Sequence, residues 1–174
     1  MLMQIITHTP PWVFALFAGL LAMGLSQLRE RTASLTRITV LPVVMFALAA
    51  SGVASAFGNS GAGLLSLAVF VKGALAAGLW VVTRKTSDGT RYNASLRQFT
   101  LPGSAWPLAL IMGIFLTKYV VGATLGMHPE LAQNTAFALG VSGLYGVFSG
   151  VFAARAVRLW RLAMASSNTL PVTA

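Results

Sequence analysis

The sequence predicts an all-α fold: a polytopic membrane protein with five transmembrane helices, its N-terminus outside and its C-terminus in the cytoplasm. The first observation is composition. Of the 174 residues, 56% are hydrophobic and only 9% are charged, whereas a soluble domain is about 25% charged. A soluble chain of this length has too little interior to bury so much apolar surface. The second observation is that the charged residues leave long uncharged stretches of membrane-spanning length.

Five such stretches can be delimited along the chain. A crossing needs about 20 apolar residues at a rise of about 1.5 Å per residue. The uncharged stretch 38–71 is too long for one crossing, and the polar turn Gly58–Gly61 divides it. The expected helices of this single membrane domain cover residues 11–28, 38–57, 62–83, 105–126 and 134–157.

The first stretch is interpreted as a retained helix and not as a signal peptide. It has no positively charged segment before its apolar core, and no small-x-small cleavage site follows. Pro10 and Pro11 fit the first turn of a helix, where a missing N–H costs little.

The basic residues predict the orientation. With five crossings, ten of the 12 Lys and Arg residues fall on one side: between the first two helices, in the loop 84–104 and in the C-terminal tail. The other side holds the N-terminus, the Gly58–Gly61 turn and the loop 127–133, without Lys or Arg. The positive-inside rule makes the basic side cytoplasmic. The tryptophans lie at expected helix ends, as in an interfacial aromatic belt: Trp12, Trp80, Trp106 and Trp160.

The cytoplasmic loop 84–104 is the longest connection. Weak alternation at Arg91–Asn93 and Arg97–Leu101 predicts a short β-hairpin. Pro102-Gly103 is typical of a turn, and Ser104 is expected to cap the next helix.

Small residues recur at helix-packing spacing in the last helix, at Gly143, Gly146 and Gly150. In lipid, close backbone approach through such residues supplies the van der Waals contact between helices. Two interpretations remain open. The glycines pack within the five-helix bundle, or they form a face for a homodimer or another membrane protein.

Lys72 and Lys118 are the most informative polar residues because each lies well inside an expected span. A lysine there costs about 2.5–3.5 kcal/mol on insertion scales. The two depths differ by about 3 Å at the helical rise, and Tyr119 and Tyr145 lie at comparable depth. These four residues form a candidate intramembrane polar site. Three alternatives remain open for the two lysines. One lysine is neutral, or both lysines face a hydrated cavity, or an anion or lipid head group lies between them. The competing interpretation is that Lys118 snorkels and each Tyr hydroxyl bonds a backbone carbonyl.

No catalytic, cofactor or metal site is predicted. The chain has no Cys, which excludes a disulfide-built domain and a cysteine-ligated metal. His8, His128 and Glu130 stand on outer loops without diagnostic spacing and are interpreted as solvated. The net charge of +9 raises the possibility of a nucleic-acid partner. The cations are spread over three segments beside membrane ends, so topology and contact with anionic lipids at the cytoplasmic face explain them more simply.

Two separated segments resemble a known family. They are the opening Ile5–Pro10 with Trp12, and the stretch from Arg97 to Leu108 followed by Gly113–Phe115 and Lys118–Gly122. This pattern is similar to a family of small uncharacterised bacterial inner-membrane proteins, a domain of unknown function. The resemblance implies a bacterial inner-membrane location and adds no activity or site residue.

The function expected from the sequence is therefore non-enzymatic. It is that of a small integral membrane protein acting through helix contacts or through an anion or lipid site at membrane depth. The alternative is a transporter or channel component with Lys72 and Lys118 lining a pathway. An enzyme is disfavoured because no carboxylate, thiol or His lies within the expected spans.

Overall fold

The computed structural model describes residues 10–84, 90–93 and 98–167. Its internal contacts group the chain into two compact units. Unit 1 comprises Met1–Glu30 and Gly103–Glu130, and unit 2 comprises Arg31–Pro102 and Leu131–Ala174. Each unit is described by itself.

Unit 1 is built on an antiparallel helix pair, α2 (Pro11–Ser26) and α5 (Trp106–Met127). Gly24 of α2 lies against Leu108 of α5, and the rings of Phe17 and Phe115 are 5.6 Å apart. Each helix begins with a proline in its first turn, where the missing N–H costs no hydrogen bond.

The residues that follow α2 contact the residues that precede α5, although the two segments are far apart in the sequence. The N–H of Ser104 donates to the carbonyl of Gln27 at 3.0 Å, and a Cβ at Gly103 would overlap the carbonyl of Leu28. The Ser104 hydroxyl accepts a hydrogen bond from the N–H of Trp106 at 3.2 Å. The N-cap of α5 is Ala105, however, and it has no side-chain cap hydrogen bond, so the expected capping by Ser104 is corrected. A short 3-10 helix, η1 (Pro129–Gln133), follows α5.

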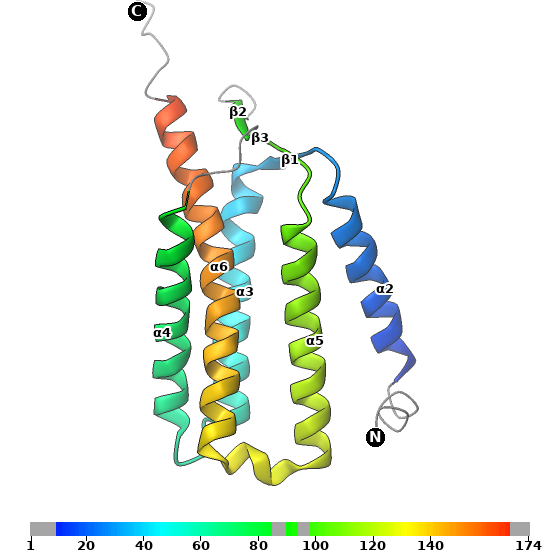
Figure 1. Cartoon of the computed structure of the whole chain (residues 1–174), viewed down its shortest axis with the longest axis vertical. Helices are drawn as coiled ribbons and strands as arrows, with labels where there is room; N and C mark the ends of the chain where they lie inside the picture. The colour runs from blue at the N-terminus through cyan, green and yellow to red at the C-terminus, as the bar shows by residue number, and fades with distance from the viewer. Residues whose placement is uncertain (1–9, 85–89, 94–97, 168–174) are drawn as a thin grey trace, which may run out of the picture. The chain divides into compact units, whose positions relative to one another are not determined.

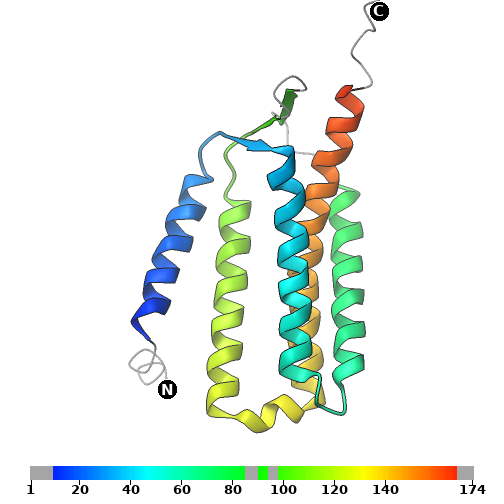
Figure 2. The ribbon, with the colours of Figure 1, turned by 180° about the vertical axis from the view of Figure 1, so that it is seen from behind.

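Unit 2 contains three long helices that lie side by side: α3 (Leu35–Phe57), α4 (Gly63–Val82) and α6 (Thr135–Ser167) (Figures 1 and 2). Helices α4 and α6 run parallel and form the most extensive contact of the chain. Helix α3 is antiparallel to α6, with Phe57 near Phe137 at one end and Thr39 near Trp160 at the other. The rings of Phe46 and Phe70 join α3 to α4, with centroids 5.2 Å apart.

A small antiparallel sheet completes unit 2. Its strand order is β1-β3-β2, with β1 at Arg31–Ser34, β2 at Arg91–Asn93 and β3 at Gln98–Leu101. Phe99 on the central strand is fully buried, and its ring lies 4.7 Å from that of Tyr92. The expected hairpin pairing of β2 with β3 is confirmed. The described residues are predominantly helical, as expected, and the sheet has one strand beyond the expected hairpin, β1 from the first connection of the chain.

The helix bounds differ from the expected ones mainly at two places. Helix α2 ends at Ser26 and has 16 residues, while the other four helices are long and apolar enough to cross a membrane. Helix α6 continues ten residues beyond the expected end, to Ser167. Its last turns are rich in Ala, Leu and Arg, which are strong helix formers, and contain no Gly or Pro to end the helix. Charge alone therefore does not mark the end of this helix.

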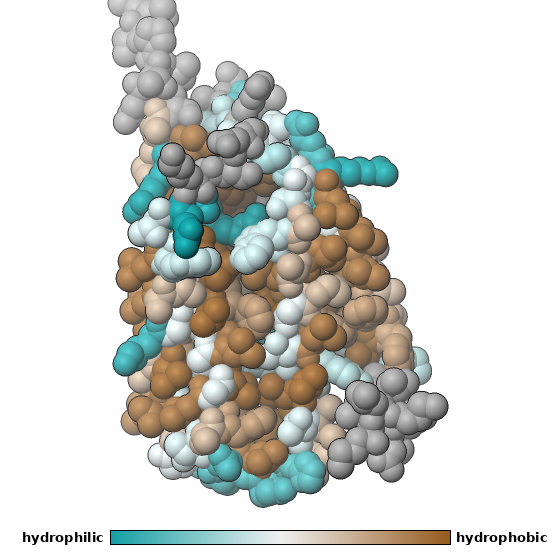
Figure 3. Space-filling view, in the orientation of Figure 1, coloured by the Kyte–Doolittle hydropathy of each residue, from teal (hydrophilic) through white to brown (hydrophobic). Residues whose placement is uncertain are grey.

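The outward faces of the helices are apolar. Leu64 is 89% exposed, Leu79 67% and Val43 65%. Figure 3 shows apolar side chains over most of the helical surface on one side of the molecule. A soluble monomer rarely exposes so large a contiguous apolar area, whereas lipid-facing helices do.

Candidate functional site: an apolar groove between α3 and α6

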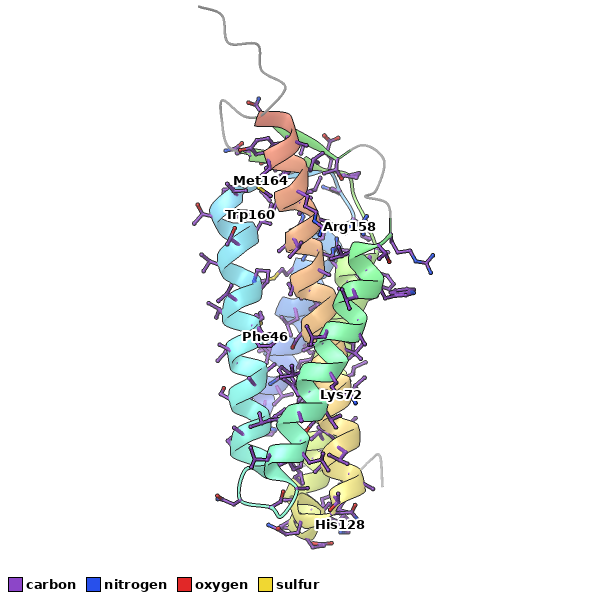
Figure 4. The ribbon with its side chains drawn as sticks, turned by 90° about the vertical axis from the view of Figure 1, so that its left-hand side faces the viewer. Phe46, Lys72, His128, Arg158, Trp160 and Met164 are labelled. Atoms are coloured by element: carbon purple, nitrogen blue, oxygen red, sulfur yellow. The ribbon has the colours of Figure 1, made fainter. Side chains whose placement is uncertain are left out.

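An open groove of about 450 Å³ lies between α3 and α6 of unit 2. This volume is within the range of about 300–1,000 Å³ that is typical of small-molecule sites. Figure 4 shows the labelled Phe46, Trp160 and Met164 along the line where the two helices meet. The lining residues are Thr39, Pro42, Val43 and Phe46 of α3, and Ala153, Ala156, Val157, Trp160, Arg161 and Met164 of α6.

A side-chain hydrogen bond holds the two walls of the groove together. The Nε1–H of Trp160 donates to Oγ1 of Thr39 at 2.8 Å, and the Thr39 hydroxyl donates in turn to the carbonyl of Leu35 at 2.9 Å. The indole is thus fixed in one orientation, with its polar N–H satisfied and its apolar ring left to line the groove.

The residue types on the two walls explain why the groove is open. On α6, Ala153 and Ala156 leave room that a larger side chain would fill. On α3, Pro42 lies inside the helix and has no N–H to donate, so it interrupts the backbone hydrogen-bond ladder beside the groove.

Arg161 provides the charge of the groove, at the end that also carries Trp160 and Met164. The described residues of unit 2 include no Asp or Glu. The groove therefore presents an apolar wall with a cation at one end, and its lining contains no carboxylate, imidazole or thiol for acid–base or nucleophilic chemistry. Such an arrangement is suited to holding an apolar chain that carries an anionic group.

The four residues of the sequence-derived polar site fall in both units. Lys72 on α4 and Tyr145 on α6 belong to unit 2, while Lys118 and Tyr119 on α5 belong to unit 1. Lys72 is exposed, about midway along α4 (Figure 4). It lies roughly opposite the buried Ala74 that faces α6, because successive residues of a helix are about 100° apart.

The remaining members of that site differ in exposure. Lys118 is exposed on α5, whereas Tyr119 is half-buried and stacks on Phe115 with 6.3 Å between ring centroids and 8° between ring planes. Tyr145 is half-buried on α6. The residues that line the groove between α3 and α6 include neither Lys72 nor Lys118.

The three glycines of α6 face α4 of the same unit. The carbonyl oxygen of Gly143 would lie 2.8 Å from a Cβ at Gly73, and a Cβ at Gly146 or Gly150 would overlap the carbonyl of Phe70 or Ala74. This geometry favours packing within the chain over the homodimer alternative, because α4 covers the face that a second copy would need.

His128 and Glu130 form a pair at the end of unit 1. The two atoms His128 Nδ1 and Glu130 Oε1 are 3.0 Å apart, and since a carboxylate only accepts, Nδ1–H is the donor. The backbone N–H of Glu130 and then this hydrogen bond hold the pKa of the Glu130 carboxyl below its ordinary value. His8 lies outside the described residues, and those that are described contain no cluster of three or more metal-ligating side chains.

Sequence reasoning missed the groove. Trp160 was expected only as an interfacial aromatic, and nothing local links it to Thr39, which lies 121 residues away. The one available signal was Pro42 within an otherwise regular apolar helix, which marks a break in the hydrogen-bond ladder.

Four helices of membrane-spanning length, outward apolar faces and a groove without catalytic groups define the class as a helical protein suited to a membrane. Within that class, the chain belongs to the family of unknown function DUF6622, which matches residues 1–169. No curated protein and no solved structure was found to match it.

Proposed function

We propose that this protein is a non-enzymatic, multi-pass protein of the bacterial inner membrane that binds a phospholipid with an anionic head group. The acyl chain lies in the groove between α3 and α6, and the phosphate lies at Arg161. The observation that carries the proposal is the apolar groove ending at a single cation, with the Trp160–Thr39 hydrogen bond fixing its walls.

Charge and depth support an anionic lipid as the occupant. The described part of unit 2 offers no carboxylate to compete for Arg161. Arg161 comes after the uncharged stretch of α6, which ends at Ala154, and this order along the helix supports a position of Arg161 at the level of the lipid phosphates. In the proposed orientation this end is cytoplasmic, and anionic lipids give that leaflet its negative surface potential.

The groove can be tested by filling it. Ala156→Phe places a ring among the lining residues, whereas Ala76→Phe adds the same ring at an exposed position of α4. We expect native mass spectrometry of protein released from phosphatidylglycerol–phosphatidylcholine nanodiscs to show retained phosphatidylglycerol for wild type and Ala76→Phe, and its loss for Ala156→Phe. Equal retention in all three proteins would refute the proposal.

The head-group contact is tested separately. Arg161→Gln leaves the groove walls in place, so the variant should still retain lipid but lose its preference for phosphatidylglycerol over phosphatidylcholine. An unchanged preference would remove Arg161 from the site.

The orientation is tested with fusions. Alkaline phosphatase fused in the Gly58–Gly61 turn is expected to be active, and the same enzyme fused after Ala174 is expected to be inactive. Phosphatase activity at Ala174 would overturn the orientation and, with it, the assignment of Arg161 to the cytoplasmic leaflet.

A further inference from the structure

Lys72 is a cation at the centre of an apolar helix. It lies at the midpoint of the 20 residues of α4, so about 15 Å of helix extends on either side of it. Its side chain is exposed, and Figure 4 labels it about midway along α4. In a bilayer with a hydrocarbon core of about 30 Å, this position is near the middle. Snorkelling to the interface serves lysines near helix ends and not one at this depth.

The chain offers no carboxylate to neutralise Lys72 within the membrane. In the part of the chain that the structure describes, the side chain of Lys72 takes part in no hydrogen bond, ion pair or cation–π contact. The three acidic residues of the sequence, Glu30, Asp88 and Glu130, all lie outside the α-helices. A second copy of the chain has the same helices, so it does not supply the missing carboxylate either.

The surface around Lys72 leaves room for another helix. Ala68 and Ala76 lie one turn before and one turn after Lys72, and all three side chains are exposed on the side of α4 that faces away from α6. Leu65 and Leu79, which lie two turns from Lys72 on the same face, are exposed as well. Small side chains let two helix backbones approach closely, and this approach brings a polar side chain of one helix within reach of the other.

We propose that this face of α4 binds a transmembrane helix of a different protein, one that carries an Asp or Glu at the middle of the membrane. An isolated lysine at this depth is costly, and charged side chains within membranes are found paired with one another. The bilayer interior itself contains only lipid tails, so the opposite charge has to come from protein. The inference rests on the proposed membrane location of the chain and not on lipid binding in the groove.

A synthetic helix tests the charge complementarity. The full-length chain is reconstituted in phosphatidylcholine vesicles with a peptide of about 20 Leu and Ala residues that carries one central Asp. Since the chain has no Cys, Gly61→Cys gives a single site for a donor dye, at an exposed position where a Cβ meets nothing within 4 Å. The acceptor dye is on the peptide.

The measured quantity is the peptide density at which energy transfer is half-maximal. We expect this density to be about 5- to 30-fold lower for the Asp peptide than for the same peptide with a central Leu. This range corresponds to the contribution of about 1–2 kcal/mol that hydrogen bonds between membrane helices make in model peptides.

Variants assign the preference to Lys72. Lys72→Met keeps an unbranched side chain and removes its charge, so it should abolish the preference for the Asp peptide without impairing insertion. Lys72→Arg keeps the charge and should retain the preference. The matched control is Lys118→Met, which removes an exposed lysine from the apolar helix α5 and should leave the preference unchanged.

Two phenylalanine variants separate this face from the groove. Ala76→Phe places a ring one turn from Lys72, and it should weaken binding of the Asp peptide while lipid retention persists. Ala156→Phe fills the groove, and it should lose the lipid while the Asp preference persists. A failure of the groove and a failure of the α4 face are therefore distinguishable.

Four results would overturn the proposal. The first is equal energy transfer with the Asp and Leu peptides when Lys72 is present. The second is an Asp preference that persists in Lys72→Met, and the third is one that disappears equally in Lys118→Met. The fourth is energy transfer between two labelled copies of the chain that is lost in Lys72→Met, since it would assign this face to a second copy.

Discussion

Replacing Gly146 by alanine tests a close backbone contact between α4 and α6. A Cβ at this position would overlap the carbonyl oxygen of Phe70 on α4, and would lie 2.9 Å from that carbonyl carbon and 3.1 Å from the nitrogen of Ala74. These are backbone atoms, which cannot turn aside as the end of a side chain can. Accommodating the added Cβ therefore requires a shift of the backbone of α4 or α6 at this contact.

The matched control is Gly140→Ala on the same helix, where a Cβ meets nothing within 4 Å. Both substitutions gain the same helix propensity, about 1 kcal/mol, so this gain cancels in the comparison. What remains is the cost of overpacking, about 1–3 kcal/mol for one added methyl group.

Thermal unfolding of the purified protein in mild detergent is the assay. For a chain of this size, a difference of 1–3 kcal/mol corresponds to about 2–12 °C between the two variants, with Gly146→Ala the less stable. Equal midpoints would refute the contact between α4 and α6. If Gly146 instead served a homodimer, the substitution would change the oligomeric state in cross-linking and leave the unfolding of the monomer unchanged.

Three further predictions concern other parts of the chain. Trp160→Phe keeps the ring but removes the hydrogen bond to Thr39, and should lower the free energy of unfolding by about 0.5–1.5 kcal/mol and broaden the groove's lipid selectivity in the mass-spectrometric assay. Phe99→Ala empties the centre of the sheet and should cost about 3–5 kcal/mol in chemical unfolding. An NMR titration should give Glu130 a pKa below 4.5 that rises only partly in His128→Gln, because the backbone N–H contributes most. Since the folded pKa is lowered, the ionised carboxylate stabilises the fold above pH 4.5, and this stabilisation is lost as the pH falls through the folded pKa.

The helices could be predicted from the sequence because their signals are local. Uncharged stretches bounded by arginines and by the polar turn at Gly58 gave each long helix to within a few residues at most ends. The exception, the C-terminal end of α6, shows the limit of using charge as a boundary. Arg155 and Arg158 are strong helix formers, so they end the uncharged stretch without ending the helix.

The sheet and the groove could be predicted only in part or not at all, because they depend on distant pairings. Residues 91–101 carry a hairpin pattern, but β1 has only four residues and is ordered by its backbone bonds to β3. The groove needs Thr39 and Trp160 to meet across 121 residues. The sequence predicted a polar site at the lysines because charge is rare within apolar helices. In the structure, Lys72 is exposed and faces away from the contact with α6.

The parallel alignment of α4 and α6 has a consequence for the order in which the protein is made. Gly150 follows its contact Ala74 by 76 residues, and the whole of α5 lies between them in the sequence. At a synthesis rate of about 5–20 residues per second, α4 waits about 4–15 s before its partner exists. During that time α4 can pack against α3 but not against α6. The most extensive helix contact among the described residues is therefore formed only after α5 has been made.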